Sequence, residues 1–423
     1  MSSHRNLISL PKNRLDTCIL LSYHLREFIK KDNVMERKSQ KKAIADFIMT
    51  LTVIFLLLLC SEFFLRWQYK SRTGISFNHR EQLFSPDKNF LYRPTPGYTN
   101  GVIDISKRSF REPLSDGNPT AKNQIGVIGS SESMASSQLF NKTYLGILAD
   151  ILKEKDGVYT YPVNAAVGGS NSTHMLKWFG EHVMKETNLK VLIIFAGWTD
   201  IVLARDLGEQ WNPDALEATG VEFTKAEIGS LTKRALRFCY EHSALASYLR
   251  QNLAPKLFSG AAQSAMGGLY KVRFDKVVNN DRVFLNYESN LKKIIELCQN
   301  KNVTVLLVQL SLAVRKQKLE EDLEAYRTGH SDEAYNGFSR WSYLYLNCQD
   351  RLHSILNRLA ETPGVFIVPF NKSLEDYPAQ ERMKFFSDLV HLTEEGHEKL
   401  GNEIYKTIIN NNIIGKVFKE NAI

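Results

Sequence analysis

The chain has few cysteines for its 423 residues and carries no short metal or nucleotide motif. Its five cysteines are widely spaced and include no C-x-x-C pair, which argues against a disulfide framework and a cysteine-ligated zinc site. At most one bridge, among Cys239, Cys298 and Cys348, is plausible. There is no P-loop or dinucleotide glycine pattern, and we find no internal repeat or low-complexity segment. The sequence therefore predicts a globular protein without metal or other cofactor.

The chain also has little net charge outside its first 42 residues. Residues 1–42 hold ten Lys/Arg against four Asp/Glu, which accounts for +6 of the formal charge of +8. The other 381 residues are thus nearly neutral at +2. Nucleic-acid binding needs a basic patch or stripe on the folded body, so we expect no nucleic-acid partner.

One long hydrophobic run follows this basic tail. The 23 residues Ala43–Leu65 include no charge between positions 47 and 61, and Trp67 and Tyr69 come just after them. About 20 apolar residues span a bilayer, and aromatic residues favour its interfaces. A buried core helix would be amphipathic, and a cleaved signal peptide would have a shorter leader and a small-x-small cleavage site. The run therefore predicts a single-pass signal anchor, with the lipid bilayer as a partner.

The positive-inside rule gives the anchor a direction. It places residues 1–42 in the cytoplasm and everything after the anchor on the outer side, whether periplasmic, extracellular or luminal. We expect four parts: a cytosolic tail (1–42), the anchor (43–66), an extended connector lying against the domain (67–120), and a catalytic-type domain (121–415). The connector is mostly polar and contains the segment Leu91–Tyr98, with two prolines.

From Gln124 onward, apolar runs alternate with helical patterns. Five runs predict strands: 125–129, 161–167, 191–196, 303–309 and 365–368. Helical patterns occupy 144–152, 175–184, 231–248, 283–298 and 341–359. Alternation of this kind is typical of a doubly wound α/β fold with a parallel, five-stranded, flavodoxin-like sheet. Two insertions, at about 198–301 and 311–340, interrupt the pattern; they fit a lid or a specificity wall, or inert elaboration.

The most informative short segment is Asp388-Leu389-Val390-His391. An Asp three residues before a His can turn back and accept a hydrogen bond from the ring, which orients a general base. Thr393 then fits a helix N-cap, with two acidic residues in the first turn. The alternative is a metal site made of Asp388, His391 and His397. We expect His397, six residues past His391, to lie on the helix surface instead.

Small and polar residues follow the first three predicted strands. They are Gly129-Ser130-Ser131, Gly168-Gly169-Ser170-Asn171 and Gly197-Trp198-Thr199-Asp200. A Ser just past a parallel strand presents both its hydroxyl and its own N–H, the geometry of a nucleophile with part of an oxyanion hole. Each turn alone has a simpler interpretation, because Ser caps helices and Gly is common in turns.

Taken together, these blocks resemble the SGNH (GDSL-type) hydrolase family over roughly residues 120–410. The family pattern has a Ser after strand one, a Gly after strand two, G-x-N-D after strand three and D-x-x-H before the last helix. The resemblance implies that Ser131 is the nucleophile of a triad with Asp388 and His391. It also implies oxyanion-hole donors from Ser131, Gly169 and the residue at position 199. The anchor, with Glu62 and Arg66 at its outer end, resembles membrane-anchored members.

Two positions depart from the family pattern. Ser130 replaces the usual Asp before the nucleophile, and Thr199 replaces the Asn of G-x-N-D. Asn offers an amide donor to the oxyanion, whereas Thr offers a shorter hydroxyl donor. Loss of one such donor costs roughly 10²–10³ in rate in a protease. The departure leaves three outcomes open: a slow enzyme, an enzyme with altered chemistry, or an inactive relative.

These patterns lead to two functional hypotheses. The first is a membrane-anchored serine esterase or acyltransferase whose partner is an acylated carbohydrate, most simply an acetyl ester, on a cell-surface or exported glycan. The second, motivated by Thr199, is a non-catalytic glycan-binding or assembly protein that keeps the fold. A plain lipase fits less well, because no long apolar lid segment is evident. Trp198, Trp211 and Tyr248 fit either a sugar-binding wall or core packing.

Overall fold

The computed structural model describes residues 43–68, 83–99, 101–113, 123–207, 212, 243–245, 280–328 and 330–418. These belong to two units that divide after Gln68. In the first unit, one helix of 26 residues, Ala43–Gln68, is long and apolar enough to cross a membrane. Among the described residues, none of its most apolar window is buried. The basic tail, Trp211, Tyr248 and nearly all of the helix predicted at 231–248 lie outside the described residues.

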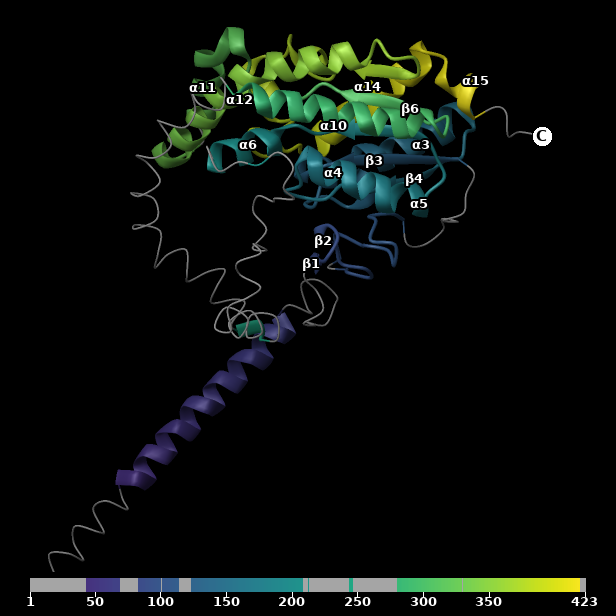
Figure 1. Ribbon diagram of the computed structural model, residues 1–423. Coiled ribbons are helices and arrows are strands. Elements are labelled where there is room, and N and C mark those ends of the chain that lie inside the picture. Colours follow the sequence, from purple (N-terminus) through teal and green to yellow (C-terminus); the bar gives the residue numbers. More distant parts are fainter. Residues whose placement is uncertain are drawn as a thin grey trace, which may run out of the picture. The chain divides into compact units, whose positions relative to one another are not determined.

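The second unit is built on a parallel five-stranded sheet (Figure 1). Its strands are β3 (Gln124–Gly129), β4 (Tyr161–Asn164), β5 (Leu189–Phe195), β6 (Thr304–Val308) and β7 (Val365–Val368). They lie in the order β4-β3-β5-β6-β7, and every neighbouring pair is parallel. The first strand of this sheet, β3, lies next to the edge; the chain steps to that edge with β4 and then returns to build the other side with β5, β6 and β7. The direction therefore reverses between β3 and β5, where doubly wound sheets bind their ligands.

Helices cover both faces of this sheet. On one face α3 (Tyr144–Asp156) packs against α14 (Glu394–Asn410). On the other, α10 (Asp281–Gln299) packs against α4 (Ser172–Trp178) and α12 (Asp332–Leu359). This arrangement follows from right-handed crossovers that run in opposite directions from β3. The predicted doubly wound α/β fold is confirmed.

Shorter elements complete the unit and supply most of the loops around the sheet. They are α2 (Ser131–Met134), η1 (Phe140–Lys142), the π-helical turn η2 (Phe179–Val183), α5 (Met184–Glu186), α6 (Trp198–Leu207), η4 (Lys316–Lys318), α11 (Leu319–Arg327), η5 (Lys372–Leu374), α13 (Ala379–Met383) and α15 (Ile413–Val417).

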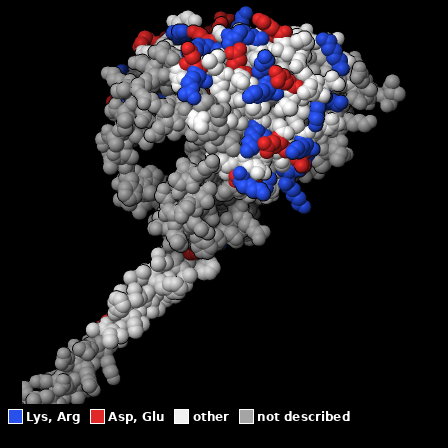
Figure 2. Space-filling view, viewed as in Figure 1, with Lys and Arg blue, Asp and Glu red and all other residues white. Residues whose placement is uncertain are grey.

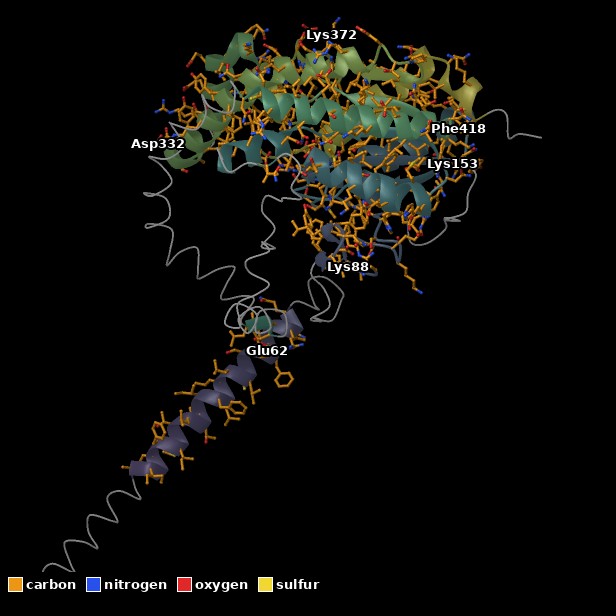
Figure 3. All side chains as sticks on the ribbon, in the orientation of Figure 1. Glu62, Lys88, Lys153, Asp332, Lys372 and Phe418 are labelled. Atoms are coloured by element: carbon orange, nitrogen blue, oxygen red, sulfur yellow. The ribbon has the colours of Figure 1, made fainter. Side chains whose placement is uncertain are left out.

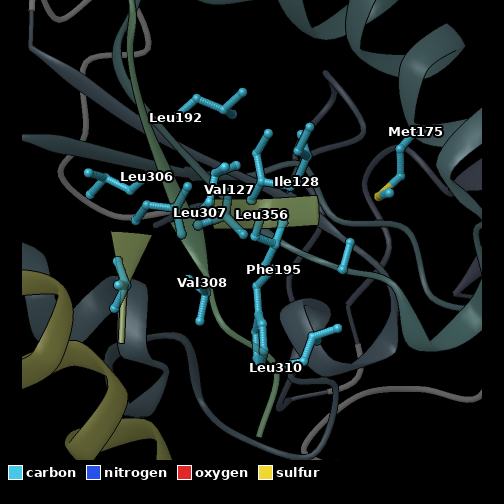
Figure 4. Close-up of a cluster of buried hydrophobic side chains, with 14 of the residues drawn as sticks. Val127, Ile128, Met175, Leu192, Phe195, Leu306, Leu307, Val308, Leu310 and Leu356 are labelled. Atoms are coloured by element: carbon cyan, nitrogen blue, oxygen red, sulfur yellow. The ribbon is translucent and has the colours of Figure 1, made fainter. Parts of the chain in front are cut away.

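The sheet is buried on both faces by aliphatic and aromatic side chains. Every residue of β3 and β4 is buried, which is why these strands appear in the sequence as apolar runs rather than alternating ones. Figure 4 shows the centre of this core, where Leu192 and Phe195 of β5 lie near Leu306 and Leu307 of β6. Cys298 and Cys348 are buried and carry free thiols.

The connector predicted for residues 67–120 contributes structure of its own. β1 (Phe84–Asp87) and β2 (Leu91–Pro94) form an antiparallel hairpin. Tyr92 of this hairpin and Phe110 further on are completely buried. Phe90 and Phe110 both pack edge-on against Trp178 of α4, at centroid distances of 5.0 and 6.1 Å. The described part of this segment therefore belongs to the core of the second unit.

The segment 311–340, interpreted from the sequence as an insertion that interrupts the strand–helix pattern, is largely helical. It contains α11, and α12 begins at Asp332 rather than near Trp341. Ser331 caps α12, because its side chain accepts a hydrogen bond from the Ala334 N–H. Two glycines, Gly329 and Gly337, and a cluster of acidic residues give this stretch the composition of a loop. Burial of Leu323, Phe338 and other apolar residues overrides that local preference.

Candidate active site

Ser131 begins the helix that directly follows β3. Gly129 ends that strand, and a Cβ there would lie 2.1 Å from the Phe195 carbonyl oxygen, so only glycine fits. α2 has only four residues and ends at Ala135, which adopts the left-handed conformation at φ 52°. As the first residue of a helix, Ser131 has an N–H without a partner in the helix itself. The tight turn therefore presents both the hydroxyl and the N–H of Ser131 beyond the sheet edge.

Asp388 and His391 form the expected dyad in the loop before α14. One carboxylate oxygen of Asp388 accepts the backbone N–H groups of Val390 and His391, both at 2.8 Å. The other lies 2.6 Å from His391 Nδ1. Thr393 caps α14 by accepting the Gly396 N–H at 3.2 Å. The carboxylate is thus fixed by its own turn and in turn fixes the imidazole.

The imidazole of His391 reaches the serine. Its Nε2 lies 2.8 Å from Ser131 Oγ, across 260 residues of sequence. Because an ionised carboxylate can only accept, Nδ1 carries the proton shared with Asp388, and Nε2 is free to accept the serine proton. The three side chains therefore have the order and polarity of a serine nucleophile, a general base and its orienting acid.

The Asp388–His391 pair shifts the pKa values of both groups in the direction that a base requires. Burial alone would lower the pKa of His391, but the hydrogen bond and charge of Asp388 outweigh it and raise that pKa above its usual value. For Asp388, burial acts to raise the pKa, and the contacts with His391 more than compensate and lower it. The side chains are 39% (His391) and 54% (Asp388) exposed. Water therefore reaches the dyad directly.

Gly169 and Thr199, the other two residues predicted for the oxyanion hole, both contact Ser130. The Gly169 N–H donates to Ser130 Oγ at 3.0 Å, and Ser130 Oγ lies 2.7 Å from Thr199 Oγ1. Gly169 has a φ of 75°, in the region that favours glycine. Turns after β3, β4 and β5 thus converge beside the nucleophile, where the strand order reverses.

Asp200, the last residue of the third block, has a supporting position. Its carboxylate accepts the Ser172 N–H at 3.1 and 3.2 Å and the Ser172 hydroxyl at 2.6 Å, at the start of α4. Asn290 of α10 donates to the same hydroxyl at 3.0 Å. Burial raises the pKa of Asp200 to about 6. This carboxylate ties the turn after β5 to the glycine-containing turn after β4.

A buried arginine, which no sequence motif singles out, holds the turn after α2. Arg111 Nη1 donates to the carbonyls of Met134 and Ala135, both at 2.7 Å, and Nη2 donates to the carbonyl of Gln138. The Arg111 backbone pairs with that of Asn164 at the end of β4. Its guanidinium recognises carbonyl groups, and contacts of that kind leave no trace in a sequence pattern.

Glu132, next to the nucleophile, is also completely enclosed. It is 2% exposed, and its Oε1 has no hydrogen-bond partner among the described residues. Burial raises the pKa of Glu132 to about 7, while its own and the Ser130 backbone N–H groups and His391 act in the opposite direction. Its charge also acts to raise the pKa of His391. The site therefore contains a second, hidden carboxyl group.

His397 lies inside the protein, so its expected place on the helix surface was wrong. It is 1% exposed and stacks on Tyr144 of α3 at 5.7 Å. Burial, followed by the nearby charge of Arg111, lowers the pKa of His397 to about 3 and keeps the ring neutral. Among the described residues no group of three or more His, Cys, Asp or Glu side chains is placed to hold a metal ion. Trp198 is 2% exposed and packs in the core.

The structure thus brings together all five residues that the sequence predicted for the site. Ser131, Asp388 and His391 form one hydrogen-bonded line, and Gly169 and Thr199 meet at Ser130 beside it. The sheet order and the placement of these residues after β3, β4, β5 and before α14 agree with the SGNH pattern. The chain has a doubly wound α/β fold that places these residues at one edge of its sheet.

Comparison with solved structures finds distant similarities to proteins described as lipases, acylhydrolases and esterases. A GDSL-like lipase from Parabacteroides merdae is 12% identical, with 70% of this chain and 98% of that one covered and a TM-score of 0.38. A lipase/acylhydrolase from Enterococcus faecalis is 12% identical, with coverages of 68% and 96% and a TM-score of 0.36. An acetyl xylan esterase is 15% identical, with coverages of 67% and 99% and a TM-score of 0.36. No protein-family model and no curated protein matches the sequence.

Proposed function

We propose that this SGNH-fold chain is a membrane-anchored serine esterase. The observation that carries the proposal is the 2.8 Å contact between His391 Nε2 and Ser131 Oγ, with Asp388 on the other ring nitrogen. A structural serine would need no base aligned on its hydroxyl. The alignment also favours an enzyme over the alternative, a glycan-binding or assembly protein without catalysis.

The reaction would proceed through an acyl-enzyme. His391 Nε2 takes the proton of Ser131 as Oγ attacks the carbonyl carbon of an ester. The resulting oxyanion would be stabilised by the Ser131 N–H and the Thr199 hydroxyl, whereas the Gly169 N–H is held by Ser130 Oγ. The imidazolium then returns the proton to the leaving alcohol, and the acyl group stays on Ser131. Water, activated by the same base, releases the acid; an acceptor hydroxyl in place of water would make the enzyme a transferase.

We further propose that the substrate is a short acyl ester, most simply acetyl, on a cell-surface or exported glycan. The support is the apolar helix Ala43–Gln68, the basic tail before it, and the solvent-accessible dyad. Figure 2 shows interspersed Lys/Arg and Asp/Glu side chains on one face of the described domain, as on an ordinary soluble surface. Because neither sign of charge dominates this face, we propose that the protein has no nucleic-acid partner.

The test uses the full-length chain in detergent micelles. Wild type should hydrolyse p-nitrophenyl acetate faster than the octanoate ester and release acetate from an acetylated polysaccharide, and Ser131→Ala should abolish both activities. A fluorophosphonate should label Ser131 in wild type, located by peptide mass spectrometry. Ser342→Ala is the matched control, because it removes a buried serine hydroxyl that donates to the Phe338 carbonyl of the same helix, α12. A wild type that neither hydrolyses nor becomes labelled would rule out the esterase and favour the binding protein.

A further inference from the structure

The hydroxyl of Ser130 joins the turns that follow three different strands. It accepts the Gly169 N–H from the turn after β4 at 3.0 Å and contacts Thr199 Oγ1, after β5, at 2.7 Å. Ser130 is completely buried and Thr199 is 5% exposed. The contact between the two hydroxyls is therefore protected from solvent, and its direction matters for the neighbouring nucleophile.

The chemistry of the three groups fixes that direction. A backbone N–H can only donate, so Ser130 Oγ is the acceptor in its bond with Gly169. The Ser130 proton then needs an acceptor of its own, and among the described residues Thr199 Oγ1 is the one within hydrogen-bond distance. If Thr199 donated instead, the unpaired proton would be that of Ser130, which is 0% exposed against 5% for Thr199 and so is the costlier of the two to leave unpaired. The order is thus Gly169 N–H to Ser130, and Ser130 O–H to Thr199.

We infer that Ser130 is a positioning residue whose donated hydrogen bond leaves the single hydroxyl proton of Thr199 free for the oxyanion. The inference deepens the proposed function and rests on it. Thr199 is held through its lone pair, and its proton is left to point toward the carbonyl oxygen of an ester on Ser131. Bonds in series of this kind also polarise one another, which strengthens the last donor.

This arrangement links the two departures from the family pattern. A carboxylate at position 130 could only accept, so it would take the one proton that Thr199 has to give. A carboxamide at position 199 has two N–H donors and could serve a carboxylate and an oxyanion together. Ser at position 130 with Thr at 199, and Asp at 130 with Asn at 199, both leave a donor free for the oxyanion. An aspartate at position 130 beside Thr199 does not. In this chain the Thr199 hydroxyl can then donate to the oxyanion in place of the Asn amide of the family pattern.

The test is a four-member cycle in the full-length protein in detergent: wild type, Ser130→Asp, Thr199→Asn and the double variant. For p-nitrophenyl acetate, Ser130→Asp should lower kcat/KM by roughly 10²–10³, mostly through kcat, because the lost bond exists only in the transition state. Thr199→Asn alone should stay within about tenfold of wild type. The double variant should recover to within about tenfold of wild type. Full activity in Ser130→Asp, or a double variant whose loss is the product of the single losses, would overturn the inference.

A second double-variant cycle tests the same hydrogen bond through the stability of the protein, without measuring enzyme activity. Thermal or urea unfolding of Ser130→Ala, Thr199→Val and their double variant should show clearly non-additive midpoint shifts. Ser342→Ala combined with Thr199→Val is the control pair and should be additive, since Ser342 lies on α12 and bonds within it. Additive shifts for Ser130 and Thr199 would contradict the inference even if Ser131 proves unreactive. An unlabelled Ser131 with non-additive shifts would refute the esterase but leave the bonded pair in place.

Discussion

At the scale of single residues, the site depends on one carboxylate that does two things. Asp388 is fixed by two backbone N–H groups of its own turn and holds the proton of His391 Nδ1. A carboxylate whose pKa is lowered remains charged well into the acid range, so it favours the imidazolium that forms during acylation. The short D-x-x-H spacing allows one residue to be both the anchor of the loop and the partner of the base.

The pH dependence of catalysis should follow from the raised pKa of His391. The base must be neutral to accept the Ser131 proton, so kcat/KM should fall with decreasing pH, with its midpoint above pH 6.5. The charged pair stabilises the fold fully below pH 6.5, and this contribution is lost as pH rises through the raised pKa. A pH profile of p-nitrophenyl acetate hydrolysis checks the catalytic half of the prediction. A midpoint at or below about pH 6 would contradict it.

Replacing Asp388 tests its orienting role. Asp388→Asn should lower kcat by roughly 10³–10⁴, because an amide can stabilise the wrong tautomer of His391. The acid limb of the remaining activity should move to lower pH, since the charge that raises the pKa of His391 is gone. Asp350→Asn, at an exposed carboxylate paired with Lys316, is the control and should leave both measurements unchanged. Retention of the full rate in Asp388→Asn would remove Asp388 from the triad.

Glu132 should make the protein less stable as pH rises through the acid range. Its folded pKa of about 7 lies above the ordinary 4.5, so the unfolded chain loses this proton first and unfolding becomes more favourable between these pH values. Because one pKa unit corresponds to about 1.4 kcal/mol, Glu132→Gln should recover roughly 3 kcal/mol of stability at about pH 8 relative to about pH 4. Urea unfolding at both values measures this. Glu398→Gln, on the exposed side of α14, should show no such gain.

At the scale of elements, α2 is too short to hold itself in place. A helix of four residues has almost no internal hydrogen bonding, and its position is set by Arg111 and by Asn164, whose side chain donates to the Ser133 carbonyl at 2.8 Å. Both come from outside the strand–turn–helix unit that carries the nucleophile. The precision of Ser131 therefore depends in part on a segment that precedes the sheet in the chain.

Arg111→Met should separate stability from catalysis. Methionine keeps much of the volume but leaves the Met134 and Ala135 carbonyls without their donor, so we expect a loss of about 3 kcal/mol in unfolding free energy and at least roughly a tenfold fall in kcat. Arg108→Met is the matched control. Arg108 pairs with Glu112 and the Glu186 carbonyl, away from α2. Equal effects on kcat in both variants would mean that Arg111 acts only on the fold.

The elements also show which features the sequence could predict. The buried strands and the D-x-x-H turn were predictable, because continuous apolar runs and a three-residue spacing are local signals. The β1–β2 hairpin and the start of α12 were not, because short polar strands and a glycine-containing helix are stabilised by contacts made elsewhere. Arg111, Glu132 and the Ser130 contact are set by distances between turns, which sequence order does not encode.

At the scale of the whole molecule, the two units differ in the polarity of their surfaces. The helix Ala43–Gln68 exposes a row of large apolar side chains, including Phe47, Leu57 and Phe63, whereas the second unit presents many charged groups around its helices (Figure 3). An apolar exterior of this length is stable in lipid rather than in water. The predicted division of the chain into tail, anchor, connector and domain remains a prediction about cellular placement.

The orientation of the anchor can be measured with the native cysteine of the tail. We expect Cys18 to be shielded from an impermeant maleimide reagent in intact cells and to react after permeabilisation, because the basic tail stays in the cytoplasm. A variant that keeps Cys18 as its only cysteine gives the readout by gel shift. The matched variant has instead a single exposed cysteine, introduced by Ser354→Cys, which should react in intact cells. The reverse pattern would place the domain in the cytoplasm.

The burial of Tyr92 has a consequence for the order in which the protein is made. Its hydroxyl donates to the carbonyl of Gly168, 76 residues later, and its ring lies 5.0 Å from that of His174. The hairpin emerges from the ribosome before β4, α4 and the glycine turn exist, so its apolar side chains have no partner when they first appear. The first part of the domain to be synthesised must therefore remain open and close only after the centre of the sheet has formed.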